Sequence, residues 1–170
     1  MRAILLGMLM SISVCTFAQS PGPDLTAACG PGKTTFTAHE SGLVIDQTTP
    51  ATGKALVYFI QDRGEASEGQ HFTVKIGMDG AWIGAYKNNA VLTISVDPGE
   101  HHVCANVQSN FAPGLNLALA HFTAQAGQVY YFRTRFLGEL PGRLDLDQPD
   151  SDQARYLIAT YPASLFKPKK

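Results

Sequence analysis

Turn-forming residues recur about every ten positions from residue 54 onward, and short segments of alternating apolar and polar residues lie between them. Asp79–Gly80, Asn88–Asn89 and Asp97–Gly99 are such turns. Asp-Gly is the dipeptide of a tight type I′ hairpin, in which both central residues have positive φ. This spacing is typical of a sandwich, so we predict an all-β fold: an antiparallel β-sandwich of about seven to eight strands.

The composition of each segment predicts how that strand is buried. Residues 54–61 are apolar on both alternating faces, which favours a central strand covered on both sides. Residues 71–78 alternate, so we expect Val74 and Ile76 to point inward and Lys75 outward. Further strands are expected at 91–96, 115–124 and 129–136, with an edge strand at 143–148.

One short C-terminal helix should follow these strands. Asp150 is placed to cap it, with Gln153 three residues on, and Pro162 ends it. A single apolar stripe marks the face that packs on the sheet: Ala154, Leu157, Ile158 and Tyr161. We therefore assign residues 54–166 to a β-sandwich domain with this helix. Residues 19–53 form an N-terminal arm with room for a short strand at 34–38, and 167–170 a basic tail.

The first 18 residues have the layout of a secretory signal peptide. Arg2 precedes an apolar run at 3–14, which is too short for a transmembrane helix, and Thr16 and Ala18 are the small residues of a cleavage site. Acylation of Cys15 is the alternative, but Val14 stands where a small residue is required. We therefore expect an exported protein of the periplasm or cell surface, without a lipid anchor or a membrane span in the mature chain.

Removal of the signal peptide leaves two cysteines, Cys29 and Cys104. In an oxidising compartment such a pair is most simply a disulfide. The bridge would close a long loop and stabilise the fold by about 4 kcal/mol in the chain-entropy model. Two free buried thiols are the alternative.

The run "EHHVC", residues 100–104, combines types of residue that bind metals. In a strand His101 and His102 point to opposite faces, so they cannot chelate one ion, whereas His102 and Cys104 share a face. These two could bind a metal with Cys29, but the disulfide is favoured, and neither a metal nor another cofactor is expected. A hydrolytic Cys104 would need a free thiol. We expect His101 to pack at the turn–strand junction with one nitrogen bonded to the backbone.

Net charge and surface residues say little about the binding partner. The net charge of −1 provides no basic footprint for nucleic acid. Tyr131, Arg133 and Arg135 share one face of a strand, and such a stripe is a candidate recognition surface for an envelope protein or glycan. The alternative is an ordinary exposed strand face, with long side chains lying along the sheet.

The stretches "TVKIGMDGAWIGAY" and "TISVDPGEHHV" combine a strand, an Asp-Gly hairpin and a "PGxH" strand start. This pattern resembles PEGA-type β-domains. With "ALVYFI" at 55–60 and "AGQVYYFR" at 126–133 it more fully resembles the bacterial domain of unknown function 2846 family. The resemblance implies an exported or lipid-anchored envelope protein with no established enzymatic role, and it assigns no functional residues.

From the sequence we expect a non-enzymatic envelope or surface module that binds or scaffolds an unidentified envelope protein or glycan. The alternative is a metal-binding or hydrolytic envelope protein that uses His102 and Cys104.

Overall fold

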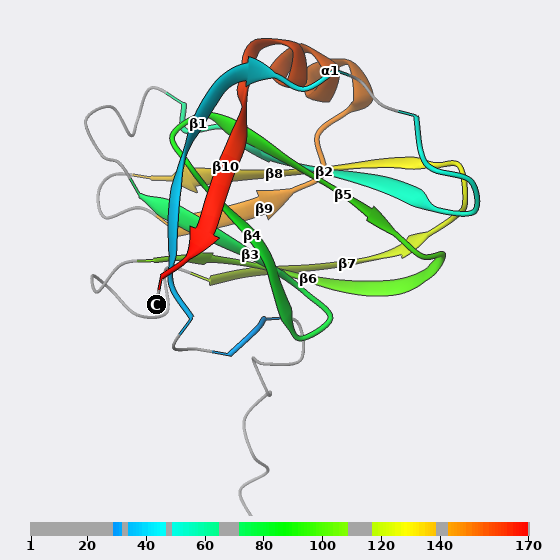
Figure 1. Ribbon diagram of the computed structural model, residues 1–170, viewed down its shortest axis with the longest axis horizontal. Helices are drawn as coiled ribbons and strands as arrows, with labels where there is room; N and C mark the ends of the chain where they lie inside the picture. Colours follow the sequence, from blue (N-terminus) through cyan, green and yellow to red (C-terminus); the bar gives the residue numbers. More distant parts are fainter. Residues whose placement is uncertain are drawn as a thin grey trace, which may run out of the picture.

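The computed structural model describes residues 29–31, 34–46, 49–64, 72–108, 117–138 and 143–169. They form two β-sheets and one helix (Figure 1). The predicted signal peptide and Cys15 lie outside the described residues. The elements in chain order are β1 (Phe36–Val44), β2 (Ala55–Gln61), β3 (Thr73–Met78), β4 (Ala81–Lys87), β5 (Ala90–Val96), β6 (Gly99–Val107), β7 (Leu117–Ala124), β8 (Val129–Leu137), β9 (Arg143–Asp147), α1 (Ser151–Thr160) and β10 (Pro162–Pro168).

One sheet has six strands in the order β1-β10-β5-β2-β8-β9, and the other has four in the order β4-β3-β6-β7. The main core lies between the sheets, and the helix covers the outer face of the larger one. Strand β2 separates these two cores, and all seven of its residues are buried. Val57 and Phe59 point into the main core, and Tyr58 and Ile60 lie under the helix. The prediction of a central strand covered on both faces is therefore confirmed.

The mostly β fold and its two sheets agree with the prediction, but the antiparallel arrangement is only partly confirmed, because the larger sheet is mixed. Strand β8 pairs with β2 in parallel, from Leu56 opposite Val129 onward, and β10 makes a parallel bridge to β5 at Ala163 and Val91. The reason is connectivity. The chain leaves β7 in the smaller sheet and crosses to the larger one, where β8 runs beside β2 in the same direction.

The described residues contain ten strands, more than the seven to eight expected. The additional strand residues lie in β1 and β10, near the two ends of the described chain. Strand β1 continues well beyond the short strand expected at 34–38, and β10 occupies residues for which no strand is predicted. They pair with each other, from Phe36 opposite Pro168 to Val44 opposite Pro162. Lys167 of the expected tail thus belongs to a sheet.

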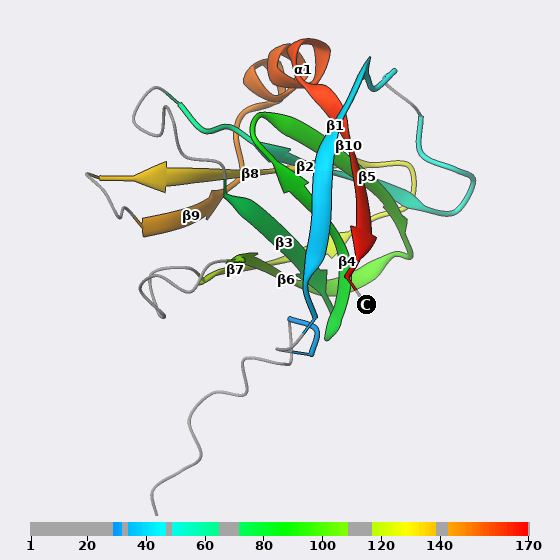
Figure 2. The same cartoon turned by 60° about the vertical axis from the view of Figure 1, so that its left-hand side comes forward.

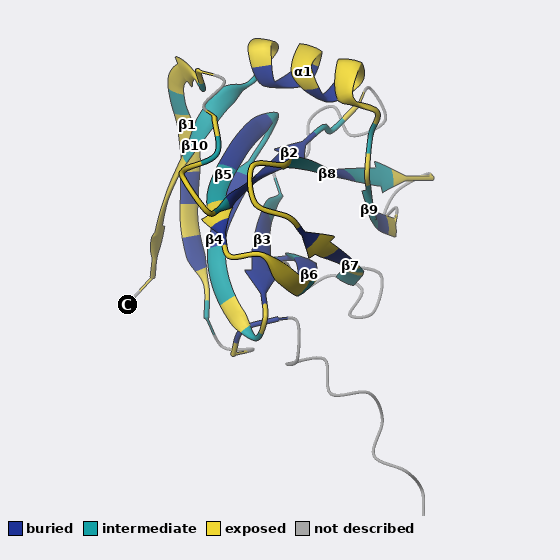
Figure 3. Ribbon diagram, turned by 90° about the vertical axis from the view of Figure 1, so that its right-hand side faces the viewer, coloured by how far each residue is buried: buried dark blue, intermediate teal, exposed yellow. Residues whose placement is uncertain are grey.

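The local turn and helix signals were confirmed. Asp79 and Gly80 have φ of 51° and 81°, as a type I′ turn requires. The Asp150 carboxylate accepts hydrogen bonds from the backbone N–H groups of Asp152 and Gln153, and so caps α1. Figure 3 shows the buried underside of the helix against the sheet and its exposed upper side. No helix among the described residues has the length and apolarity that a membrane span requires.

The segment before β1 is fixed on the outer face of the smaller sheet. Lys75 Nζ donates to the Thr34 carbonyl at 3.0 Å and lies 4.1 Å from the centre of the Trp82 ring. Lys75 points outward as predicted, but it is only 4% exposed because this segment covers it. Trp82 Nε1 donates to the Pro31 carbonyl. A Cβ added at Gly30 would lie 2.4 Å from Trp82 Cδ1, so only glycine fits there.

Strand β1 then crosses the outer face of β4, where Phe36 and Ala38 pack with Ala85. The Gln108 side chain accepts from the Phe36 N–H at 2.6 Å and donates to the Phe36 carbonyl at 2.8 Å, as a neighbouring strand would. Figure 2 shows β1 and β10 running side by side across the strands of the smaller sheet. We call residues 36–44 and 162–168 together the β1–β10 ribbon.

Candidate functional site

The histidine run lies at the start of β6, where the chain has turned after β5. His101 is partly buried against Phe122, with ring centroids 5.4 Å apart. Its Nδ1 lies 2.6 Å from Asp79 Oδ2, and its Nε2 lies 2.8 Å from the Asp97 carbonyl. The prediction of a packed histidine with one nitrogen bonded to the backbone is confirmed. Because His101 also contacts Asp79, it links the hairpin turn at Asp79 to the turn at Asp97.

Both partners of the His101 ring are acceptors, so the two contacts favour the protonated imidazole, in which both ring nitrogens donate. Burial lowers the pKa of His101, but the hydrogen bonds to the Asp97 carbonyl and the Asp79 carboxylate outweigh it, so the pKa is raised above 6.5. Burial raises the pKa of Asp79. The bonds from His101 and from the His102 N–H outweigh that effect, and its pKa falls below 3.8. The pair therefore orients the hairpin turn by charge-assisted hydrogen bonds.

Cys104 is joined to Cys29 by a disulfide with a Cα–Cα distance of 5.2 Å. Cys104 is fully buried and Cys29 is 7% exposed. The predicted disulfide is confirmed, and it uses the thiol that a metal-binding or hydrolytic Cys104 would need. No group of three or more His, Cys, Asp or Glu side chains within the described ranges is placed to hold a metal ion.

His102 lies on the opposite face of β6 from His101 and is exposed. His121 of β7 lies directly opposite it, with ring centroids 6.3 Å apart. Glu100 Oε1 lies 3.9 Å from His102 Nε2. Sequence reasoning missed His121, because only the register of β6 against β7 brings the two histidines together.

The expected Tyr-Arg-Arg stripe on β8 is only partly exposed, because Arg133 is buried and Tyr131 and Arg135 are half-buried. Strand β9 lies beside it, so Asp147 falls opposite Arg133 and Asp145 opposite Arg135. Arg133 is 6% exposed and donates from Nε and Nη2 to the two Asp147 oxygens at 3.0 and 2.7 Å. These hydrogen bonds raise the pKa of Arg133, and the stripe forms an ion-pair ladder between two strands.

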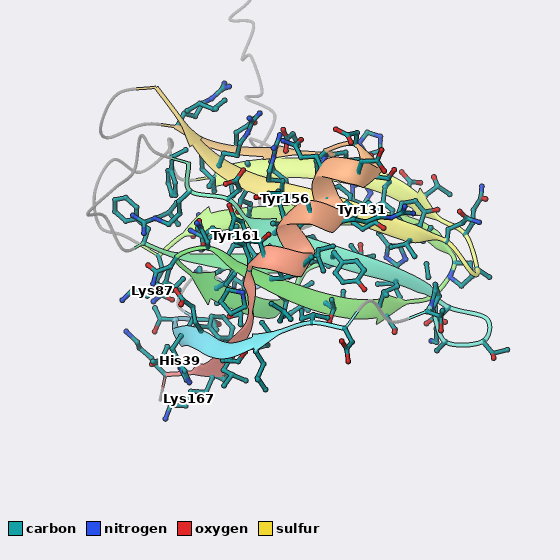
Figure 4. The ribbon with its side chains drawn as sticks, turned by 90° about the horizontal axis from the view of Figure 1, so that it is seen from above. His39, Lys87, Tyr131, Tyr156, Tyr161 and Lys167 are labelled. Carbon is teal, nitrogen blue, oxygen red and sulfur yellow. A yellow bond between two sulfur atoms is a disulfide. The ribbon has the colours of Figure 1, made fainter. Side chains whose placement is uncertain are left out.

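Tyr131, the third member of that stripe, is partly buried at the edge of the helix. It stacks on Tyr58 with ring centroids 5.7 Å apart and packs against the core beneath α1. Tyr161 follows the helix and donates its hydroxyl to Asp62 Oδ1. Figure 4 shows Tyr131 and Tyr161 beside the helix and Tyr156 on it. The physical reason for this difference from expectation is the helix itself, which covers this face of the sheet.

Exposed large apolar side chains gather instead on the β1–β10 ribbon. Leu43 is 72% exposed, Val44 53% and Leu165 49%. Phe166 is 36% exposed, but it lies on the opposite face of β10 from Leu165 and packs edge-to-face on the buried Phe36. Such residues are ordinary when scattered, but three on one two-stranded unit form a candidate contact surface.

The outward face of the ribbon is also basic. Thr37 lies opposite Lys167 and His39 opposite Leu165, so Leu165 is flanked by two side chains that can carry positive charge. Figure 4 places His39 and Lys167 together on this ribbon. Among the described strands β1 pairs only with β10, so its other edge carries no strand. Sequence reasoning missed this surface, because β1 lies in the expected N-terminal arm and β10 lies where no strand was predicted.

The fold is that of a small two-sheet β-protein, cross-linked by one disulfide and carrying a basic, apolar ribbon at one edge. The chain belongs to the DUF2846 family, described as a protein of unknown function, whose model matches residues 51–140. That segment contains β2 to β8, whereas β1, β9, α1 and β10 lie outside it. No curated protein and no solved structure matches the chain.

Proposed function

We propose that the protein is an exported, non-enzymatic module of the cell envelope that binds a partner protein through the β1–β10 ribbon. The observation that carries this proposal is the concentration of exposed aliphatic side chains on that ribbon: Leu43, Val44 and Leu165. Exposing these side chains to water does not stabilise a monomer, whereas a partner that covered them would remove their apolar surface from water.

Export is supported by two features. The first 18 residues read as a signal peptide, and the Cys29–Cys104 disulfide is of the kind that persists in oxidising compartments. The envelope assignment also fits the resemblance to PEGA-type β-domains.

The chemistry of the ribbon favours a protein over a glycan. Its exposed apolar residues Leu43, Val44 and Leu165 are all aliphatic, whereas sugar rings are generally bound against flat aromatic side chains. The edge of β1 offers backbone groups that an extended segment could pair with. Because His39 and Lys167 flank Leu165, the partner segment should combine apolar with acidic residues.

Site-specific photo-crosslinking in intact cells tests the proposal. A photoreactive residue at position 165 should give a discrete protein adduct in the envelope fraction. The matched control is position 119 on β7, where Leu119 is 53% exposed against 49% for Leu165. Equal adducts from both positions, adducts with glycan alone, or no adduct at 165 would each contradict a protein-binding ribbon.

A further inference from the structure

We propose that His102 and His121 form a surface chelate for a divalent transition-metal ion such as Zn²⁺ or Cu²⁺, assisted by Glu100. The two histidines face each other across the antiparallel β6–β7 pair. Directly opposite residues in such a pair have Cβ atoms about 5 Å apart, so their imidazoles can reach one ion between them. Neutral imidazole is a preferred ligand of Zn²⁺ and Cu²⁺.

The ring positions are close to those that a shared ion needs. An ion bound about 2 Å from a ring nitrogen lies about 3 Å from that ring's centre, so two rings on one ion have centres up to about 6 Å apart. The rings of His102 and His121 are 6.3 Å apart, with planes inclined by 35°. Both side chains are exposed, so a small rotation about their side-chain bonds closes this difference.

Glu100 supplies the negative charge of the site. It lies two residues before His102 on the same strand face, and its Oε1 is 3.9 Å from His102 Nε2. A carboxylate at that distance lowers the electrostatic cost of bringing a dication to the imidazole, acting through water rather than as a third ligand. The site thus rests on two histidine ligands, with the remaining positions open to water.

The backbone beneath the site is fixed. Strand β6 pairs with β3 on one side and β7 on the other, and the His102 N–H donates to Asp79 Oδ1 at 2.8 Å. Two residues further on, Cys104 is held by the disulfide. The spacing of His102 and His121 is therefore set by the sheet before any ion arrives, which favours chelation over two independent weak sites.

Titration with Zn²⁺, and separately with Cu²⁺, tests this proposal on the purified protein with its disulfide intact. Isothermal titration calorimetry should show one ion per chain. His102→Ala and His121→Ala should each weaken binding by about tenfold or more, and Glu100→Gln by a smaller factor. The matched control is His39→Ala, which removes another exposed histidine and should leave metal binding unchanged.

All four variants change exposed side chains, so their unfolding transitions should match the parent, and equal stability separates lost ligands from lost fold. Binding that survives in the His102→Ala/His121→Ala double variant would overturn the chelate, as would an equal loss in His39→Ala. The result is independent of crosslinking at position 165, so this proposal and the ribbon proposal can fail separately.

Discussion

Cys104, in the middle of β6, is covalently joined to Cys29, which lies 75 residues earlier in the chain. The bond links the central region of the smaller sheet to the segment that precedes β1. Lys75 and Trp82 hold the same segment by hydrogen bonds to its carbonyl groups. The disulfide therefore fixes the entry of the chain into the β1–β10 ribbon as well as the sheet.

Replacing both cysteines should destabilise the protein strongly. We expect Cys29→Ala/Cys104→Ala to lower the free energy of unfolding by about 4 kcal/mol, because the open chain regains the entropy of a long loop. Urea unfolding followed by tryptophan fluorescence measures this change. The parent protein unfolded with reductant should show the same loss, and an unchanged midpoint in both would show that the bridge contributes nothing.

Export makes a separate prediction about the same cysteines. In intact bacteria the full chain should carry Cys29 and Cys104 in a form that thiol reagents modify only after reduction. A chain without residues 1–18 should stay in the reducing cytoplasm with both thiols free. Gel-shift alkylation separates the two forms, and full oxidation of the truncated chain would argue that the disulfide does not report export.

The His101–Asp79 pair predicts a stability that falls as pH rises through the folded pKa of His101, which lies above 6.5. The pKa of His101 is raised in the folded state, so its contribution is complete below its ordinary value of 6.5 and is lost as pH rises through the folded pKa. The pKa of Asp79 is lowered, so its contribution is present above 3.8 and is lost as pH falls through its folded pKa. Between these limits the pair stabilises fully.

Above this pH range we expect the free energy of unfolding to fall by less than about 1 kcal/mol, because the Asp79 side chain is 44% exposed. Urea unfolding between pH 5.5 and pH 9 should show the decline in the parent and in His102→Gln, but not in His101→Gln. A decline of the same size in His101→Gln would assign it to another group.

Gln61 offers a test of the core. It is 1% exposed, and neither side-chain polar atom has a hydrogen-bond partner in the part of the chain that the structure describes. A buried amide without partners costs about 1–3 kcal/mol. Gln61→Met, of similar volume, should therefore raise the free energy of unfolding by about 1–2 kcal/mol. Gln61→Glu should lower it, and destabilisation by the methionine would show that the amide is satisfied in solution.

Signals that act within one segment were read correctly from the sequence. The apolar faces of residues 54–61, the Asp-Gly turn and the Asp150 cap each depend on neighbours a few residues away, and each appears in the structure as expected. The same holds for His101, whose bond to the Asp97 carbonyl spans only four residues.

Features that depend on which strands become neighbours were not predictable in the same way. The β1–β10 pairing, the parallel β2–β8 pair and the opposition of His102 and His121 are set by long-range register. Arg133 was expected on an open face, because nothing near it in sequence shows that β9 will place Asp147 opposite. The candidate surfaces therefore emerge only from the assembled sheets.

The most direct test of the ribbon proposal is the affinity of the partner captured at position 165 for surface variants of this protein. Leu43→Ser/Leu165→Ser should weaken that binding at least about tenfold, since each buried aliphatic side chain contributes about 1.5–3 kcal/mol. Leu119→Ser should bind as the parent does, and all variants should unfold alike. Unchanged binding by the ribbon variant, or an equal loss in Leu119→Ser, would contradict a partner docked on the β1–β10 ribbon.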